Sequence, residues 1–132
     1  MQQIDVKTGS REELVDITDK VQRIVAESGL EEGALLLFCA HTTAALTVNE
    51  NADPSVMRDI VVNMATLVPH SGDYRHAEGN SDAHIKSSLF GPSLLLVVSR
   101  GQVVLGTWQG VYFCEFDGPR SRKVWAQLLP AA

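Results

Sequence analysis

The chain has 132 residues and a mass of 14.4 kDa, a length that suits one domain over residues 1–132 around a single hydrophobic core. Its net charge of −5 argues against a nucleic-acid partner, because affinity for the phosphate backbone comes from Lys and Arg on one face. No apolar run approaches the roughly 20 residues of a membrane span, so we expect a cytoplasmic protein without a membrane partner. Cys39 and Cys114 lie in apolar segments, which favours reduced, buried thiols.

Two helices are predicted in the first half of the chain, among several strands. The first helix is capped by Thr18 and ends at Gly29, and the second begins at Asp53-Pro54 and stops before Pro69. Strands are predicted over residues 4–6, 13–17 and 35–50, the last as a strand pair or as one long bent strand.

The second half of the chain begins with a polar loop over residues 71–79 and a short helix that closes at Gly91. Strands then follow over residues 94–98, 103–106, 107–116 and 123–129, joined by turn sequences at Arg100-Gly101 and Asp117-Gly118-Pro119. Two main helices and a short third among many neighbouring strands indicate an α+β fold with a largely antiparallel sheet.

Three histidines, His41, His76 and His84, lie beside small or acidic residues, where an aliphatic core would not place them. His41 follows an apolar run, whereas His76 and His84 bracket a polar segment, so we expect a strand end and a loop to converge. Three imidazoles that leave one coordination position open form the ligand set with which catalytic zinc activates water. The alternative is that each histidine is an ordinary hydrogen-bonded side chain.

Two carboxylates and a basic cluster are further candidates. Glu115 lies in an apolar setting, where a carboxylate costs free energy unless it is ligated or paired with an arginine. Glu50 precedes the capping residues of the second helix and has no capping role of its own. The cluster of Arg120, Arg122 and Lys123 is the place to look for an anion site in this acidic chain.

A resemblance to a known family rests on four segments, which occur in the order HTTAALTVNENADP, YRHAEGNSDAHIKSSLFG, GQVVLGTWQGVYFCEFDG and PRSR. Together they closely resemble the YjbQ-like family, whose members are described as secondary thiamine-phosphate synthase enzymes. The likeness covers nearly the whole chain, and one departure is Val97, where many relatives carry a proline. The resemblance implies a compact α+β fold, a homotrimer with pockets near subunit boundaries, and metal binding by the matching His41, His76 and His84.

The activity implied by the resemblance joins hydroxymethylpyrimidine diphosphate to a thiazole phosphate and releases pyrophosphate, which would make the protein a transferase of small phosphorylated molecules. The cofactor is expected to be a divalent metal, with magnesium suited to the departing diphosphate and zinc suited to the histidines. As catalytic residues we assign Glu50, Glu115 and Arg120. As substrate-binding residues we assign Lys86, Thr107, Trp108, Gln109 and Arg122.

Two alternatives stay open. In the first, a histidine-bound metal activates water to hydrolyse a small metabolite, with Glu50 or Glu115 as the base. In the second, the protein is a non-catalytic trimer that binds a metal or a metabolite, and its histidines hold a structural ion or cap the subunit interface.

Overall fold

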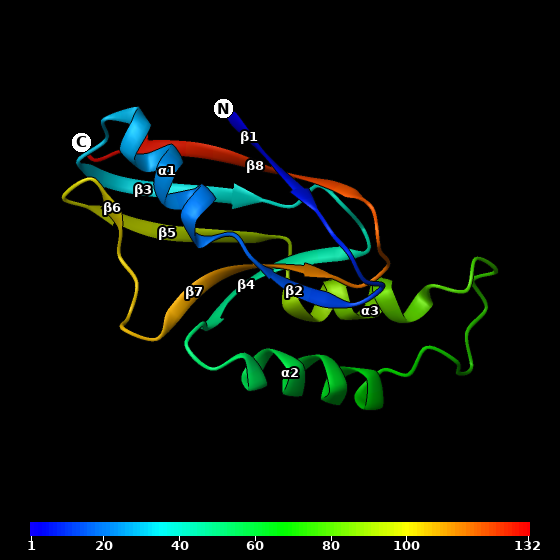
Figure 1. Ribbon diagram of the computed structural model, residues 1–132. Coiled ribbons are helices and arrows are strands. Elements are labelled where there is room, and N and C mark those ends of the chain that lie inside the picture. The colour runs from blue at the N-terminus through cyan, green and yellow to red at the C-terminus, as the bar shows by residue number, and fades with distance from the viewer.

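The computed structural model describes residues 1–132 as eight strands and three helices (Figure 1). The strands are β1 (Gln2–Lys7), β2 (Glu13–Asp16), β3 (Glu32–Phe38), β4 (Ala44–Glu50), β5 (Ser93–Ser99), β6 (Gln102–Val103), β7 (Gln109–Glu115) and β8 (Ser121–Pro130). The helices are α1 (Thr18–Ser28), α2 (Pro54–Leu67) and α3 (Ser81–Phe90). These elements confirm the predicted α+β class and the three helices.

The strands form two sheets, and every pairing in them is antiparallel. One sheet has five strands in the order β1-β8-β3-β5-β6, and the other has three in the order β2-β7-β4. The apolar stretch of β3 runs through the middle of the larger sheet, where Leu35 lies opposite Leu96 on β5 and Leu128 on β8. The expected antiparallel sheet is therefore divided into two.

One hydrophobic core joins both sheets and α1. Side chains that alternate along the strands point into it, and α1 adds residues at helical spacing. The central members are fully buried: Leu35, Leu37, Leu46, Val111, Phe113, Val124, Val21 and Val25. A separate small cluster lies on the opposite side of the three-stranded sheet, and it consists of Ala45, Ala83, Cys114 and Phe116.

Local signals placed most helix ends correctly. Asp53 Oδ1 accepts a hydrogen bond from the Ser55 N–H at 2.9 Å, with Pro54 as the first residue of α2. Gly29 ends α1 with φ of 75°, a conformation that favours glycine. The expected cap at Thr18 is wrong, because Thr18 is itself helical and its N–H donates to Asp16 Oδ1 at 2.9 Å.

The segment predicted as a strand pair or one bent strand is two strands in different sheets. β3 ends at Phe38 in the larger sheet, β4 begins at Ala44 in the smaller one, and residues 39–43 cross between them. His41 lies in this crossing, so strand alternation does not decide where its side chain points.

The strands predicted over residues 103–106 and 107–116 are both shorter than expected. A turn separates them, in which the Gln109 N–H donates to the Gly106 carbonyl and the Gly106 N–H donates to Gln109 Oε1. Thr107 and Trp108 belong to this turn and not to a strand, and the Trp108 side chain is 63% exposed.

Two apolar surfaces are only partly covered. No residue of α2 is fully buried, although Met57, Ile60, Val61 and Met64 form a half-buried apolar stripe along the helix, which lies beneath the smaller sheet (Figure 1). The outer face of the five-stranded sheet exposes Phe38, Leu95, Val97 and Leu129. No helix in the structure has the length and hydrophobicity needed to cross a membrane.

Candidate functional site

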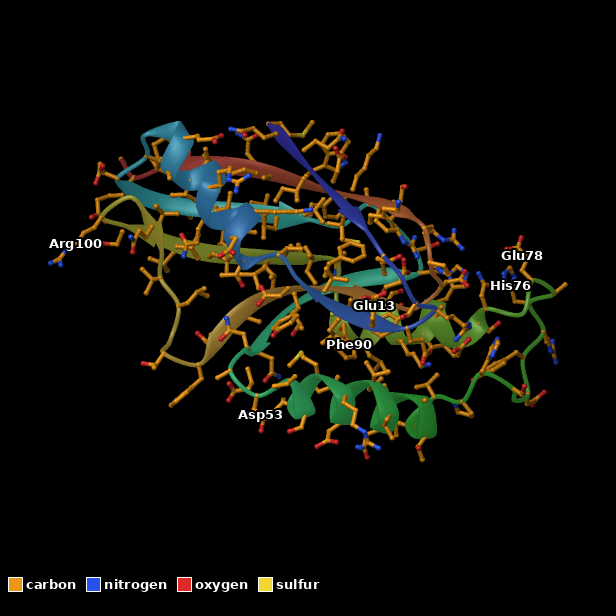
Figure 2. The ribbon with its side chains drawn as sticks, viewed as in Figure 1. Glu13, Asp53, His76, Glu78, Phe90 and Arg100 are labelled. Carbon is orange, nitrogen blue, oxygen red and sulfur yellow. The ribbon has the colours of Figure 1, made fainter.

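The three histidines lie near one another: His41 is in the crossing between β3 and β4 and bonds the backbone of β8, and His84 is on α3 with its ring next to that of His76. Hydrogen bonds tie α3 and the residue after it to the crossing segment and to β4: Ser87 Oγ donates to the Thr42 carbonyl at 2.7 Å, and the Leu46 N–H of β4 donates to the Gly91 carbonyl at 3.1 Å. The loop over residues 71–79 brings His76 to the same end, whereas Arg100 marks the opposite end (Figure 2). The expected convergence of a strand end and a polar loop is observed.

His41 is held by the backbone of β8. Its Nε2 accepts a hydrogen bond from the Lys123 N–H at 3.0 Å, which assigns the ring proton to Nδ1. Burial and the nearby Arg122 guanidinium lower the pKa of His41, so the imidazole is neutral at pH 7. In this arrangement neither ring nitrogen has a free lone pair.

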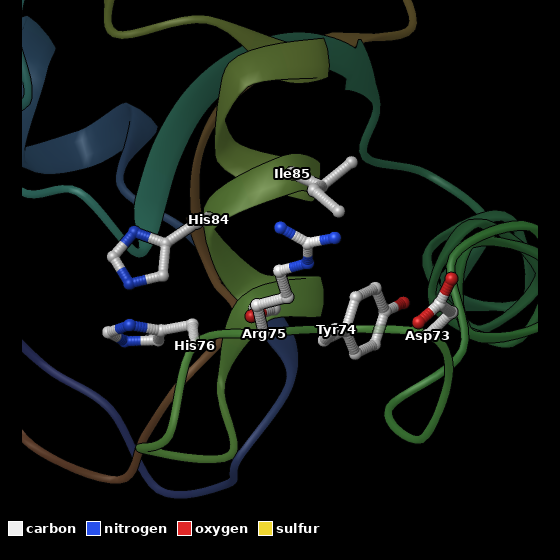
Figure 3. Close-up of a pocket in the computed structure, with 7 residues that line it drawn as sticks. Asp73, Tyr74, Arg75, His76, His84 and Ile85 are labelled. Atoms are coloured by element: carbon white, nitrogen blue, oxygen red, sulfur yellow. The ribbon is translucent and has the colours of Figure 1, made fainter.

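His76 and His84 face each other. Their ring centroids are 5.3 Å apart, and the rings are nearly perpendicular, at 89°. His84 projects from α3 and His76 from the preceding loop, and the two rings lie one above the other at the side of a groove (Figure 3). Glu78 is the nearest carboxylate to this pair, with its Oε2 3.6 Å from His76 Nε2.

His84 lines three neighbouring grooves. The first, of about 400 Å³, also contains His76, and the second, of about 320 Å³, also contains His41. The third, of about 410 Å³, contains Arg120 and Asn80 and has no hydrophobic side chain in its wall. The position of His84 thus links the surroundings of all three histidines.

The histidines fit a metal only in part. Two imidazoles on one tetrahedral zinc have ring centres about 5 Å apart, and the His76–His84 pair has this spacing. His41 does not fit while its Nε2 is bonded to Lys123, and no three His, Cys, Asp or Glu side chains form a ready ligand group. Metal binding by all three histidines therefore stays a prediction.

Glu115 and Arg122 form a buried ion pair. Arg122 Nε donates to Glu115 Oε1 at 2.9 Å, and Arg122 Nη2 donates to Glu115 Oε2. The side chain of Glu115 is 0% exposed and that of Arg122 is 3% exposed. Burial alone would raise the pKa of Glu115, but Arg122, the Asp117 N–H and the Thr8 hydroxyl hold it below the ordinary value. The salt-bridge alternative is what the structure contains, and neither side chain faces a groove described above.

Lys86 and Arg120 are also engaged with carboxylates. Lys86 is 1% exposed, and its Nζ donates to Asp82 Oδ2 at 3.0 Å and pairs with Glu12. Arg120 donates to the Asp117 carbonyl at 2.8 Å and to its carboxylate at 3.2 Å, although its half-exposed side chain still lines the third groove.

Four predicted residues lie at the far end of β4. Glu50 is paired with Gln109 in the register of β4 and β7, whereas Ala44, near the histidines, is paired with Glu115. Six residues of strand separate these positions by about 20 Å. Glu50, Thr107, Trp108 and Gln109 are therefore not brought to the histidines within one chain.

Several residues that line the grooves were not predicted from the sequence. Tyr74 and Arg75 line the first groove, and Thr42, Ser87 and Ser88 line the second. Their only sequence signal was position, because each lies close to one of the three histidines along the chain.

Comparison with known proteins places the chain in a family. Residues 2–131 match the family described as "UPF0047 protein YjbQ-like". The chain belongs to the YjbQ family. A UPF0047 protein of Methanocaldococcus jannaschii is 48% identical over 94% of this chain and 90% of its own length. The UPF0047 protein YugU of Bacillus subtilis is 47% identical over 96% of each chain.

Solved structures of YjbQ family members have the same fold. A family member from Clostridium acetobutylicum matches with a TM-score of 0.96 and 50% identity, covering 98% of this chain and all of that one. A protein of unknown function from Sulfolobus solfataricus matches with a TM-score of 0.94 and 36% identity, covering 98% and 96%. These matches establish the family and the fold, and they name no activity.

Removing one partner of the buried Glu115–Arg122 ion pair should strongly destabilise the fold. We expect Arg122→Met to lower the free energy of unfolding by about 3–5 kcal/mol, because Glu115 would be left buried without its counter-charge. Urea denaturation measures the change. The control is Arg58→Met, which removes an exposed pair with Asp59 and should cost less than about 1 kcal/mol. An equal loss of unfolding free energy in Arg122→Met and Arg58→Met would contradict a special role for the buried pair.

Proposed function

We propose that this YjbQ family member is a metal-dependent transferase that joins hydroxymethylpyrimidine diphosphate to a thiazole phosphate. The observation that carries the proposal is the position of His84, which lines three adjoining grooves. A reaction between two substrates requires two binding sites that meet at one point, whereas hydrolysis of one metabolite requires a single site. The family resemblance supplies the identity of the two substrates.

The reaction balances without an additional reactant. The thiazole ring nitrogen attacks the methylene carbon of the pyrimidine, a C–N bond forms, and the C–O bond to the diphosphate breaks. The electron pair of that bond leaves with pyrophosphate, and the thiazole nitrogen gains a positive charge. The protein must therefore orient the two rings and stabilise negative charge on the departing group.

We further propose that the histidines hold a divalent metal. The His76–His84 pair supports two of the ligands by its spacing, and His41 would become the third by giving up its bond to Lys123. Three imidazoles favour zinc over magnesium. When bound, such a metal supplies positive charge next to the leaving diphosphate.

The third groove supports binding of a polar, charged molecule. Its wall consists of polar and ionisable side chains, with Arg120 as its cation. We assign Arg120 the role of contacting an anionic group there, although Asp117 already neutralises part of its charge. Lys86, Glu115 and Arg122, predicted to act on substrate, would instead position the groove walls through their buried ion pairs.

We also propose that the protein is a homotrimer. Its surface of 7498 Å² exceeds the roughly 6,800 Å² expected of a monomer of this mass, and the excess fits the exposed apolar face of the larger sheet. Association of copies is also the route by which Glu50 and the 107–109 turn would reach the histidines of a neighbour.

Metal content tests the histidine assignment. Elemental analysis of protein purified without chelator or affinity tag should give close to one zinc per chain. His76→Ala and His84→Ala should lose the metal, and His41→Ala should bind it at least about tenfold more weakly. The control His70→Ala should keep it, because His70 Nε2 contacts the Gly79 carbonyl instead.

A wild-type protein free of metal would contradict the metal proposal. Full zinc content in His41→Ala would show that His41 keeps its bond to Lys123 and that two histidines suffice.

Product analysis tests the reaction. Purified protein with zinc or magnesium and both substrates should release thiamine phosphate and pyrophosphate in equal amounts, and His84→Ala should abolish both products. Phosphate or pyrophosphate without thiamine phosphate would favour the hydrolase. No turnover of either kind would overturn an enzymatic role and favour a binding protein.

The oligomeric state can be measured by light scattering. We expect three times the chain mass of 14.4 kDa for the wild type. Leu95→Lys, on the outer sheet face, should shift the mass towards one chain, whereas the control Val62→Lys, on α2, should leave it unchanged. A monomeric wild type, or a Leu95→Lys protein that remains trimeric, would contradict this proposal.

A further inference from the structure

Most basic side chains near the histidines are already neutralised. Arg122 is paired with Glu115, Lys86 with Asp82, and Arg120 with Asp117. A guanidinium or ammonium group in such a pair gives up most of its attraction for a further anion. A phosphorylated ligand of this acidic chain would therefore gain more from a cation that has no carboxylate partner than from Arg120 alone.

Arg75 is the unpaired cation in the first groove. Its exposed side chain makes no hydrogen bond or ion pair with another residue, and it lies directly beside His76 in the chain. Figure 3 shows its guanidinium reaching towards Ile85, with the His76–His84 pair on one side and the Tyr74 ring on the other. Asp73 belongs to the same groove wall but forms no ion pair with Arg75.

The loop that carries Arg75 is braced by its own hydrogen bonds. Tyr74 OH donates to the Pro69 carbonyl at 2.5 Å, and the Tyr74 N–H donates to the Gly72 carbonyl at 2.9 Å. A further bond of 2.7 Å joins His70 Nε2 to the Gly79 carbonyl and closes the loop near its other end. The backbone at Arg75 is thus held in place while its side chain is free to meet a ligand.

We propose that Arg75 binds a phosphoryl group of the ligand in the 400 Å³ groove between this loop and α3. The guanidinium offers a planar fork of N–H donors that matches two phosphate oxygens at once. The groove places this fork next to His76 and His84, so a bound phosphoryl group lies beside the proposed metal ligands. The assignment deepens the proposed function, on which it rests, by naming the residue that takes the anionic part of the substrate.

The experiment measures binding of inorganic pyrophosphate by calorimetry, with metal-free and with zinc-loaded protein. Arg75→Gln should weaken binding by about tenfold or more in both forms, because charge-assisted hydrogen bonds are lost. Arg75→Lys should recover part of the loss, since it restores the charge without the fork. The control Arg100→Gln removes an equal charge at the opposite end of the molecule and should bind as the wild type does (Figure 2).

The metal-free arm separates this proposal from the metal proposal. Loss of affinity in metal-free Arg75→Gln supports the role of Arg75 even if the histidines bind no zinc. Wild-type affinity in Arg75→Gln overturns it, as does failure of the wild type to bind pyrophosphate in either form. Malonate is the comparison anion, and binding of malonate as tight as that of pyrophosphate would overturn the preference for phosphoryl groups.

Discussion

Buried charge organises the end of the molecule that carries the histidines. Glu115 and Arg122 pair in the core, and Arg122 also donates to the Thr43 hydroxyl at 2.9 Å. Because ions at this depth are stable only when each is paired and hydrogen-bonded, β7, β8 and the crossing segment must meet in the one arrangement that satisfies them. His41 lies two residues before Thr43 and bonds the backbone of Lys123, next to Arg122, so the same pair fixes its position.

A second ionic network docks α3, the helix that carries His84. Its buried residues are Asp82, Ala83 and Lys86, so charge replaces most of the apolar stripe expected of a packed helix. Burial would raise the pKa of Asp82, but Arg11 and Lys86 hold it below its ordinary value. The charged side chains occupy the inner face of α3 and leave His84 at the grooves.

The sequence predicted those parts of the fold that depend on neighbouring residues. The glycine at position 29 and the pair Asp53-Pro54 mark helix ends through their own backbone preferences, and both predictions are confirmed. The division of the strands into two sheets depends on pairings between distant segments, which no local pattern contains. The assignment of Lys86 to substrate has the same cause in part: Asp82 is only four residues away, but the second partner, Glu12, lies 74 residues earlier.

In the candidate site, too, contacts between distant segments decide what each side chain can do, and the sequence does not reveal them. Residue types were enough to select three histidines and to expect them at one end of the fold. Whether an imidazole can bind a metal depends on its lone pairs, and the lone pair of His41 Nε2 is taken by a backbone N–H from β8. Likewise, basic residues are equivalent in sequence, but carboxylates neutralise Arg120 and Arg122 in the structure. In the first groove the charge available to a ligand is that of Arg75, which has no carboxylate partner, and only the pairing seen in the structure distinguishes it from Arg120 and Arg122.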